Sequence, residues 1–384
     1  MFAEVIENIS SIDATAWDTC AGTAHPFTRH AFLSALEKSG CVSSATGWFP
    51  QHIVAYADTT KQDIVGIMPL YLKDHSYGEY VFDWAWADAY QRAGLKYYPK
   101  LLCAIPFTPV NGARLIIKSD VQDCQEIRQL LLGKAFQLGN ELNISSIHWL
   151  FTTEQDSSFL SRAKITRRSG SQFHWRNQNY SSFNDFLADM SHKKRKNIRR
   201  ERRRITDAGI KYVASNNAEL SPQHTNEMFN FYQRTIQRYG AQQYLNREFF
   251  ERITTSMPES VLFLFAKFEN VFLAGGLFYI GDESLYGRYW GANNDYHSLH
   301  FETCYYQPIE YCINNGLKLF EAGAQGEHKL ARGLLPVKTY SYHWLNDPRF
   351  MSAVDQYTKE ENSHVDRYTE LLGAHSPFRA DRNK

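Results

Sequence analysis

The sequence contains few cysteines, and none of them has the spacing of a disulfide framework or a zinc site. Six are spread over 384 residues, and no two form a Cys-x-x-Cys pair. Isolated cysteines of this kind are typical of reduced thiols in the core of an intracellular protein. The sequence therefore predicts neither a disulfide-stabilised secreted fold nor a zinc ribbon. The cysteines are Cys20, Cys41, Cys103, Cys124, Cys304 and Cys312.

Long apolar runs are also absent. The longest, Val271–Ile280, is interrupted by Gly275 and Gly276, and it is well short of the roughly 20 apolar residues that a membrane-spanning helix needs. The first ten residues carry acidic side chains, where a secretory signal needs lysine or arginine. We therefore expect a cytoplasmic protein without a transmembrane segment.

Charge of neither sign is in excess, because 42 Lys and Arg face 41 Asp and Glu. No overall field draws the protein toward nucleic acid or a membrane, so any anion binding must be local. Aromatic residues are plentiful, with 25 Phe and 23 Tyr, which indicates a folded chain. The length favours two domains, and we predict them at residues 1–175 and 176–384.

In the first half, helical and strand-like patterns mingle without regular alternation. Such mingling favours an α+β (mixed α/β) fold over a doubly wound sheet. The expected helices cover residues 27–40 and 126–142, and the expected strands cover 51–57, 64–73, 80–84, 115–118 and 146–151.

In the second half, the patterns predict three antiparallel strands, a helix, a short strand and a later strand. Pro308 falls inside that helix, and we expect a kink or a later helix start there because proline lacks the N–H that an interior turn needs. These strands cover Val261–Phe268, Val271–Ile280, 285–290, 317–321 and 339–345, with the helix at 301–315; earlier helices are expected at 183–190, at Pro222–Tyr239, and from a cap at Asn246 to Met257.

A basic run begins the second half. The segment MSHKKRKNIRRERRRI places nine Lys or Arg between Lys193 and Arg204 against the single Glu201. On a helix these cations cover most of the circumference, so they repel one another and would be stabilised by phosphates. Three interpretations remain open: a solvated helix face, a site for a polyanionic donor or acceptor, or contact with an anionic membrane surface. For binding we single out Lys193, Lys194, Arg195 and Arg199.

Several other long segments are distinctive. They read HPFTRHAFLSALE (25–37), SYGEYVFDWAWADAY (76–90), KYYPKL (96–101), YGRYWGAN (286–293), HFETCYYQPIEY (300–311) and FEAGAQGEHKLARGLLPVKTYSYH (320–343). Through these segments and the basic run, the chain resembles the FemAB-like branch of the GNAT acyltransferase superfamily. Within that branch, it resembles the bacterial family of predicted N-acyltransferases once labelled peptidoglycan biosynthesis or recognition proteins.

The resemblance implies two tandem GNAT-like acyltransferase domains. In the GNAT fold, three antiparallel strands, a helix and a parallel strand form the centre, and two parallel strands separate so that the acyl donor lies between them. In related Fem enzymes, an aminoacyl group passes from tRNA to an amine on a cell-wall precursor. The resemblance thus implies an N-acyltransferase with no tightly bound cofactor, whose donor is an acyl-CoA, an acyl-carrier protein or an aminoacyl-tRNA.

The segment Arg288–Asn293 departs from an ordinary acyl-CoA GNAT. The usual pyrophosphate loop ends in Gly or Ala and leads directly into a helix whose N–H groups hold the phosphates. Here Asn293 stands at the last position, and Tyr289 and Trp290 put bulky rings in the loop. A different grip on the donor is expected. Backbone N–H groups near Arg288 to Gly291 are expected to stabilise the oxyanion, with Arg288 in the binding site.

A glycine-rich loop follows the strand at 317–321, at the edge of the expected gap. Within it, His328 and then Glu327 are our candidates for taking the proton of the acceptor ammonium. Gln325, Lys329 and Arg332 are candidates for substrate binding. The alternative is a structural loop, since glycine marks turns freely. Tyr289 and Tyr340 are candidates for reprotonating the leaving group.

Glu302 begins the expected helix, where the macrodipole favours an acid, and it could orient Arg288. His297, His300 and Glu302 imitate the spacing of metal ligands, but the pattern is weak and we expect no metal.

In the first half, Glu79, Asp83 and Trp86 could form an amine-acceptor pocket, with Trp86 offering its face to a cation. Alternatively, the rings fill a core and the acids cap a helix. The sequence thus predicts a cytoplasmic enzyme in which an amine attacks a thioester or tRNA ester directly, with an anionic donor or acceptor, tRNA among the candidates. The alternative is a non-catalytic GNAT-like module that binds RNA or a cell-wall precursor.

Overall fold

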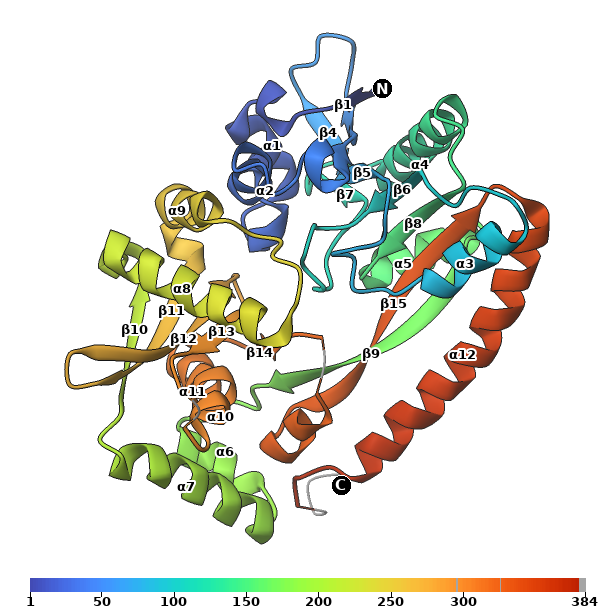
Figure 1. Ribbon diagram of the computed structural model, residues 1–384. Helices are drawn as coiled ribbons and strands as arrows, with labels where there is room; N and C mark the ends of the chain where they lie inside the picture. Colours follow the sequence, from blue (N-terminus) through green and yellow to red (C-terminus); the bar gives the residue numbers. More distant parts are fainter. Residues whose placement is uncertain (295, 325, 380–384) are drawn as a thin grey trace. The chain divides into compact units, whose positions relative to one another are not determined.

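The computed structural model describes residues 1–294, 296–324 and 326–379, and its contacts divide the chain into two compact units (Figure 1). The first unit comprises Met1–Gly170 and Lys338–Arg367, and the second comprises Ser171–Val337 and the segment from Tyr368. This division corrects the two contiguous domains predicted at 1–175 and 176–384. The reason is that a late strand returns to pair with the first unit, which no local pattern reveals.

The first unit contains a small antiparallel sheet in the order β1-β3-β4-β7. Every residue of β3 and β4 is buried, because helices cover both faces. The chain approaches α4 so closely at Gly66 that an added Cβ would lie 2.5 Å from Ile127. The strands are β1 (Phe2–Ile6), β3 (His52–Tyr56), β4 (Ile64–Met68) and β7 (Ile116–Ile117).

A second set of strands in the first unit runs β15-β8-β6-β5-β2. Strands β6 and β8 pair in parallel, whereas β15 with β8, β6 with β5, and β5 with β2 pair antiparallel. These strands are β2 (Trp48–Pro50), β5 (Leu70–Lys73), β6 (Lys100–Cys103), β8 (Ser146–Leu150) and β15 (Leu335–Leu345). The α-helices are α1 (Ala14–Ala21), α2 (His30–Lys38), α3 (Trp84–Arg92), α4 (Cys124–Glu141), α5 (Glu154–Arg162) and most of α12 (Pro348–Ala374).

Two sequence expectations for this unit were wrong. The strand at 64–73 is two strands in different sheets, because Pro69 between them has no N–H to continue a ladder. The strand at 80–84 is absent, and Trp84 instead begins α3. Aromatic residues gave this segment a strand-like composition, but its acids turn inward to a buried lysine, as described below.

The second unit contains the strand order β10-β11-β12-β13-β14-β9, to which β9 contributes its part from Ser171 onward. The expected β-β-β-α-β sequence of elements is confirmed, with β13 and β14 parallel. The strands are β9 (Thr166–Arg176), β10 (Lys211–Asn216), β11 (Val261–Phe268), β12 (Val271–Ile280), β13 (Ser284–Ala292) and β14 (Leu319–Glu321). The helices are α6 (Phe183–Asp189), α7 (His192–Asp207), α8 (Pro222–Tyr239), α9 (Arg247–Ser256), α10 (Leu299–Phe301) and α11 (Gln307–Asn314).

The helix between β13 and β14 is interrupted at the place that Pro308 predicts. Glu302–Tyr306 forms a π-helical turn between α10 and α11, and Pro308 lies in the first turn of α11. The missing N–H of a proline removes an i→i−4 bond, and a π turn accommodates the break. The helix interior is apolar, since Ile309 and Cys312 are fully buried.

Candidate functional site

Strands β13 and β14 separate after three paired residues. Ser284–Tyr286 pairs with Leu319–Glu321, and β14 then ends while β13 continues to Ala292. Among the described strands, none other than β12 pairs with the continuing part of β13. The GNAT resemblance predicts that these two strands separate, and their pairing ends at Tyr286 and Glu321.

A β-bulge lies at the start of the separated part. Leu277 pairs with Tyr289 and Phe278 pairs with Gly287, which leaves Arg288 as the extra residue. A bulge re-aims the backbone and increases the local twist. The backbone near Arg288, which we expected to stabilise the oxyanion, therefore departs from the regular hydrogen-bonding pattern of the sheet.

Helix α8 packs against the end of β13, beyond the bulge. The Thr235 hydroxyl donates to the Trp290 carbonyl (2.7 Å), and a Cβ on Gly291 would lie 1.9 Å from the Phe231 carbonyl oxygen. Glycine is required at 291 because the α8 backbone packs directly on it. The open part of the β13 edge is therefore short and is centred on the bulge.

The glycine-rich loop after β14 folds back beside β13. An added Cβ on Gly323 would lie 3.7 Å from the Gly287 carbonyl oxygen, and Gly323 has a left-handed φ of 84°. Lys329 is buried and donates from Nζ to the Gly323 carbonyl (2.7 Å). Burial lowers the pKa of Lys329 to about 8; the thiol of Cys304 opposes the shift and Arg288 adds to it.

His328 lies at the exposed side of the same loop. Its Nε2 is 2.7 Å from the Tyr305 hydroxyl, and its ring centroid is 6.0 Å from that of His300. Partial burial lowers the pKa of His328, and the cations of Arg332 and Lys329 add to the effect. A histidine with a lowered pKa is neutral at pH 7 and can accept a proton.

The neighbours of His328 are mostly engaged in contacts of their own. Glu327 accepts from the Tyr368 hydroxyl (2.6 Å), and Arg332 donates to Glu201 (3.1 Å) and covers the Phe301 ring, 3.4 Å from its centroid. These contacts favour positioning roles for the two predicted site residues. Gln325, the remaining candidate in this loop, lies outside the described residues.

The expected contact between Glu302 and Arg288 was wrong. Glu302 is buried and accepts from Arg202 Nε (3.1 Å) and Gln307 Nε2 (2.7 Å). Arg202 also donates to Glu310 (2.5 Å). Burial raises the pKa of Glu302 against the opposing effect of Arg202. Glu302 therefore joins α7 to the π turn instead of orienting the strand.

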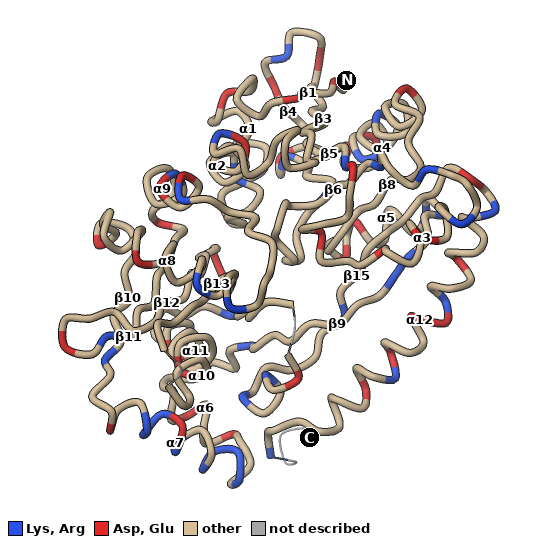
Figure 2. Tube along the Cα trace, viewed as in Figure 1, with Lys and Arg blue, Asp and Glu red and all other residues tan. Residues whose placement is uncertain are grey.

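The basic run forms α7, as Figure 2 shows. Ile198 and Ile205 are buried on its inner side, while Lys193 and Arg199 are exposed. Among the described residues, no carboxylate lies within 4 Å of four of its cations, unlike Arg202 on the inner side. Those four are the predicted binding residues Lys193, Lys194, Arg195 and Arg199. A face of unneutralised cations suits a polyanion.

The two candidate tyrosines lie in different units. The Tyr289 ring packs against Tyr232 at 5.0 Å between centroids, in the second unit. Tyr340 belongs to the first unit, where the Arg167 guanidinium lies 5.3 Å from its ring centroid. Of the two, Tyr289 is the one adjacent to the bulge.

The predicted acceptor pocket in the first unit is instead an internal ion cluster. Lys100 Nζ lies 2.8 Å from a Glu79 oxygen and 2.5 Å from an Asp83 oxygen, and all three side chains are buried. Burial raises the pKa of Glu79 to about 7 despite the attraction of Lys100. Lys100 already supplies the cation that the two acids require. Trp86 packs on His343 (4.8 Å between centroids).

Sequence reasoning missed the rest of this cluster. The Tyr97 hydroxyl donates to Asp83 (2.6 Å) and lies 3.1 Å from His148 Nε2, and the Nδ1 atoms of His148 and His343 are 2.6 Å apart. Burial lowers the pKa of His148 to about 3. The signal was a repeated Ser-x-His pattern, at 146–148 in β8 and 341–343 in β15, which pair across the sheet.

In the first unit, the corresponding parallel pair, β6 and β8, is not open beyond its paired residues. The fully buried guanidinium of Arg114 donates from Nε to the Leu150 carbonyl (2.7 Å) and from Nη2 to the Val110 carbonyl (2.8 Å). Gly112 also forms an isolated parallel β-bridge with Thr152. Arg114 thus fills the space at the end of β8, so the candidate donor site is in the second unit.

Within the described residues, no group of three or more His, Cys, Asp and Glu side chains is placed to hold a metal ion. In the same part of the chain, no helix is both long and apolar enough to cross a bilayer.

The protein has two compact units and is of the mixed α/β class. Residues 8–380 match the FemAB-like family, described as peptidoglycan biosynthesis/recognition. The chain therefore belongs to the FemAB-like family. No curated protein matches the sequence.

Solved structures share the fold at low sequence identity. The crystal structure of FemX is 10% identical, covers 92% of this chain and 100% of its own, and gives a TM-score of 0.54. L-PGS from Bacillus licheniformis is 10% identical over 87% of this chain and 97% of its own, with a TM-score of 0.51. The C-terminal domain of a putative lysylphosphatidylglycerol synthetase from Agrobacterium fabrum is 8% identical over 92% and 97%, with a TM-score of 0.53.

Proposed function

We propose that the protein transfers an acyl or aminoacyl group from an activated donor to an amine in its second unit. The observation that carries this proposal is the separation of β13 from β14 beside the bulge at Arg288. An extended donor arm fits a strand edge because main-chain groups can bind it along its length. The His328 loop lies next to the same edge.

The reaction has one bond-forming step. The neutral amine nitrogen attacks the donor carbonyl carbon, and the carbon–sulfur bond of a thioester or the carbon–oxygen bond of a tRNA ester then breaks. The ammonium proton passes to His328, and the leaving thiolate or alkoxide takes up a proton, for which Tyr289 is the nearest candidate to the bulge. The backbone of β13 near Arg288 to Gly291 stabilises the oxyanion.

His328 is suited to the proton transfer because it is neutral near pH 7 and held by a neighbour. The Tyr305 hydroxyl fixes the ring through Nε2 (2.7 Å), which leaves Nδ1 for the substrate. The Lys329 ammonium donates a hydrogen bond to the Gly323 carbonyl and so holds the loop against β13. In this arrangement His328 is the catalytic residue, and Lys329 and Arg332 are positioning residues.

We further propose that the donor is polyanionic and contacts α7. Within the described ranges, Lys193, Lys194, Arg195 and Arg199 have no carboxylate within 4 Å, and phosphates would relieve their repulsion. We propose aminoacyl-tRNA as the donor, as the resemblance to Fem enzymes implies, with acyl-CoA and acyl-carrier protein as alternatives. The acceptor is an amine of a cell-wall precursor, and the reaction takes place in the cytoplasm, with α7 also able to reach an anionic membrane surface.

The test is a transfer assay on the full chain. Purified protein is incubated with radiolabelled aminoacyl-tRNA or acyl-CoA and with amine-bearing peptidoglycan precursors, and the products are analysed by mass spectrometry. A mass increase of the acceptor by one acyl or aminoacyl group supports the proposal. RNA binding with no transfer from any donor would favour a non-catalytic binding module instead.

A further inference from the structure

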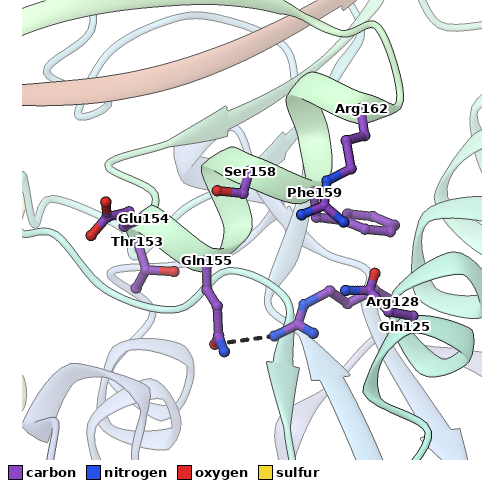
Figure 3. Close-up of a pocket in the computed structure, with 8 residues that line it drawn as sticks. All are labelled: Gln125, Arg128, Thr153, Glu154, Gln155, Ser158, Phe159 and Arg162. Carbon is purple, nitrogen blue, oxygen red and sulfur yellow. Dashed lines mark hydrogen bonds between the residues drawn. The ribbon is translucent and has the colours of Figure 1, made fainter.

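A pocket of about 570 Å³ lies between α4 and the first turns of α5, wholly within the first unit (Figure 3). It is separate from the residues proposed above for catalysis. Its volume is within the range of small-molecule sites, roughly 300–1,000 Å³. Two arginines, two glutamines and a phenylalanine line most of it, namely Arg128, Arg162, Gln125, Gln155 and Phe159.

Arg128 is a buried cation to which no carboxylate of the described residues is hydrogen-bonded. Its side chain is held by neutral groups, with Nη2 donating to Gln155 Oε1 (3.2 Å) and Nη1 to the Cys124 carbonyl (3.5 Å). The residue is only 5% exposed, and Nε has no hydrogen-bond partner among the described residues. A buried charge held only by neutral groups is costly. An anion in the pocket would offset that cost.

The neighbouring carboxylate of Asp156 does not fill this role. Asp156 is buried and attracts Arg128 at longer range. Its carboxylate, however, accepts the backbone N–H of Arg114 (2.7 Å), and its own N–H donates to Thr153. It is thus committed to the turn at the start of α5.

Arg162 brings a second cation to the same side of the pocket. Figure 3 shows the Arg162 guanidinium beside the Phe159 ring, the Arg128 guanidinium below it next to Gln155, and the Glu154 carboxylate at the other end of the pocket. Arg162 is exposed, and in the described part of the chain no carboxylate lies within 4 Å of it. The first turn of α5 carries Glu154 and Asp156, so the arginines, not the helix dipole, would hold an anion.

We propose that this pocket binds the phosphate group of a small phosphorylated ligand of up to nucleotide size. Two guanidinium forks match the oxygens of a phosphate. The Gln125 and Gln155 amides add neutral hydrogen-bonding groups, and the Phe159 ring provides an apolar surface beside them. This assignment does not depend on the transferase activity, because none of these residues belongs to the second unit.

The test is isothermal titration calorimetry of the full chain with inorganic phosphate, pyrophosphate and ADP at constant ionic strength. Saturable binding of at least one probe with one site per chain is expected. Arg162→Gln should weaken it at least tenfold, since an exposed residue can be changed without unfolding the protein. Lys164→Gln, which removes an exposed cation just beyond α5, should leave the affinity within twofold.

Two further measurements separate this site from other phosphate-binding surfaces. Replacing Lys193, Lys194, Arg195 and Arg199 of α7 by glutamine should not change the affinity for the probe. Arg128→Met should retain the fold but lose the increase in melting temperature that the probe causes. The proposal is overturned if no probe binds, if Arg162→Gln binds normally, or if malonate binds and phosphates do not.

Discussion

His328 is the residue on which the proposed chemistry depends most directly. We expect His328→Gln to fold normally and to lower turnover by ~10² or more, the range of a general base. Glu327 is the neighbouring residue, and its carboxylate accepts a hydrogen bond from Tyr368. Glu327→Gln should therefore reduce turnover far less. Steady-state kinetics of the two variants decide between them, and a His328→Gln enzyme with full turnover would remove His328 from the mechanism.

The pH dependence of the rate provides a second test of His328. A general base must be deprotonated, so kcat/KM should rise with pH through the pKa of His328. Because burial and the neighbouring cations lower that pKa, the rise should be centred below pH 6.5, the ordinary value for histidine. Tyr305→Phe removes the hydroxyl bonded to Nε2 and should shift the midpoint of the pH profile. An unchanged midpoint would argue against this contact.

Lys100 is the residue whose loss should destabilise the first unit most. Lys100→Met leaves Glu79 and Asp83 buried without their cation, and breaking such a buried pair costs about 3–5 kcal/mol. Lys359→Met is the control, because Lys359 pairs with Asp355 on the surface of α12, and such pairs are worth roughly 0–1 kcal/mol. Urea denaturation measures both. Equal effects would show that the cluster contributes no more than a surface pair.

At the scale of elements, the packing of α8 on β13 sets the limit of the open strand edge. Gly291→Val would place a Cβ against the Phe231 carbonyl, and overpacking of this kind typically costs 1–3 kcal/mol. Gly133→Ala in α4 is the control, since nothing lies within 4 Å of its Cβ position and alanine favours the helix by about 0.5–1 kcal/mol. Thermal denaturation measures both variants. The melting temperature of Gly291→Val should be lower than that of the unaltered protein, and that of Gly133→Ala should be higher.

Helix α7 should govern the salt dependence of donor binding. Replacing its four outer cations by glutamine should weaken aminoacyl-tRNA binding and make the slope of log K against log salt shallower. The helix itself should persist, because Ile198 and Ile205 stay buried and Arg202 keeps its two acids. Filter binding at several salt concentrations, with circular dichroism, checks both statements. A slope equal to that of the unaltered protein would exclude α7 from the contact.

For the whole molecule, the two units make different use of the same strand arrangement. Arg114 fills the end of the parallel pair in the first unit, whereas β13 and β14 separate in the second. Donor binding should therefore slow amide hydrogen exchange at residues 287–290 and 326–333 and leave 104–114 unchanged. Mass spectrometry of the full chain with and without donor measures this. Protection at 104–114 alone would place the donor in the first unit.

The sequence by itself determined the elements with strong local signals. The strands Val261–Phe268 and Val271–Ile280 and the helix Pro222–Tyr239 have the bounds that their turns and caps predict. The break at Pro308 and the segments shared with the FemAB-like family are equally local properties. Loop residues such as His328 could be nominated because glycine and polar residues mark a loop wherever it folds.

Only the tertiary structure decided which groups meet. Lys100 forms ion pairs with Glu79 and Asp83, which lie 21 and 17 residues away in the sequence. His148 contacts His343, 195 residues away. Glu302 is hydrogen-bonded to Arg202 instead of Arg288. Contacts of this kind depend on strand register and helix packing, which pair residues far apart in the chain, and no local pattern encodes them. For the same reason, the return of β15 to the first unit and the pocket around Arg128 become visible only in the folded chain.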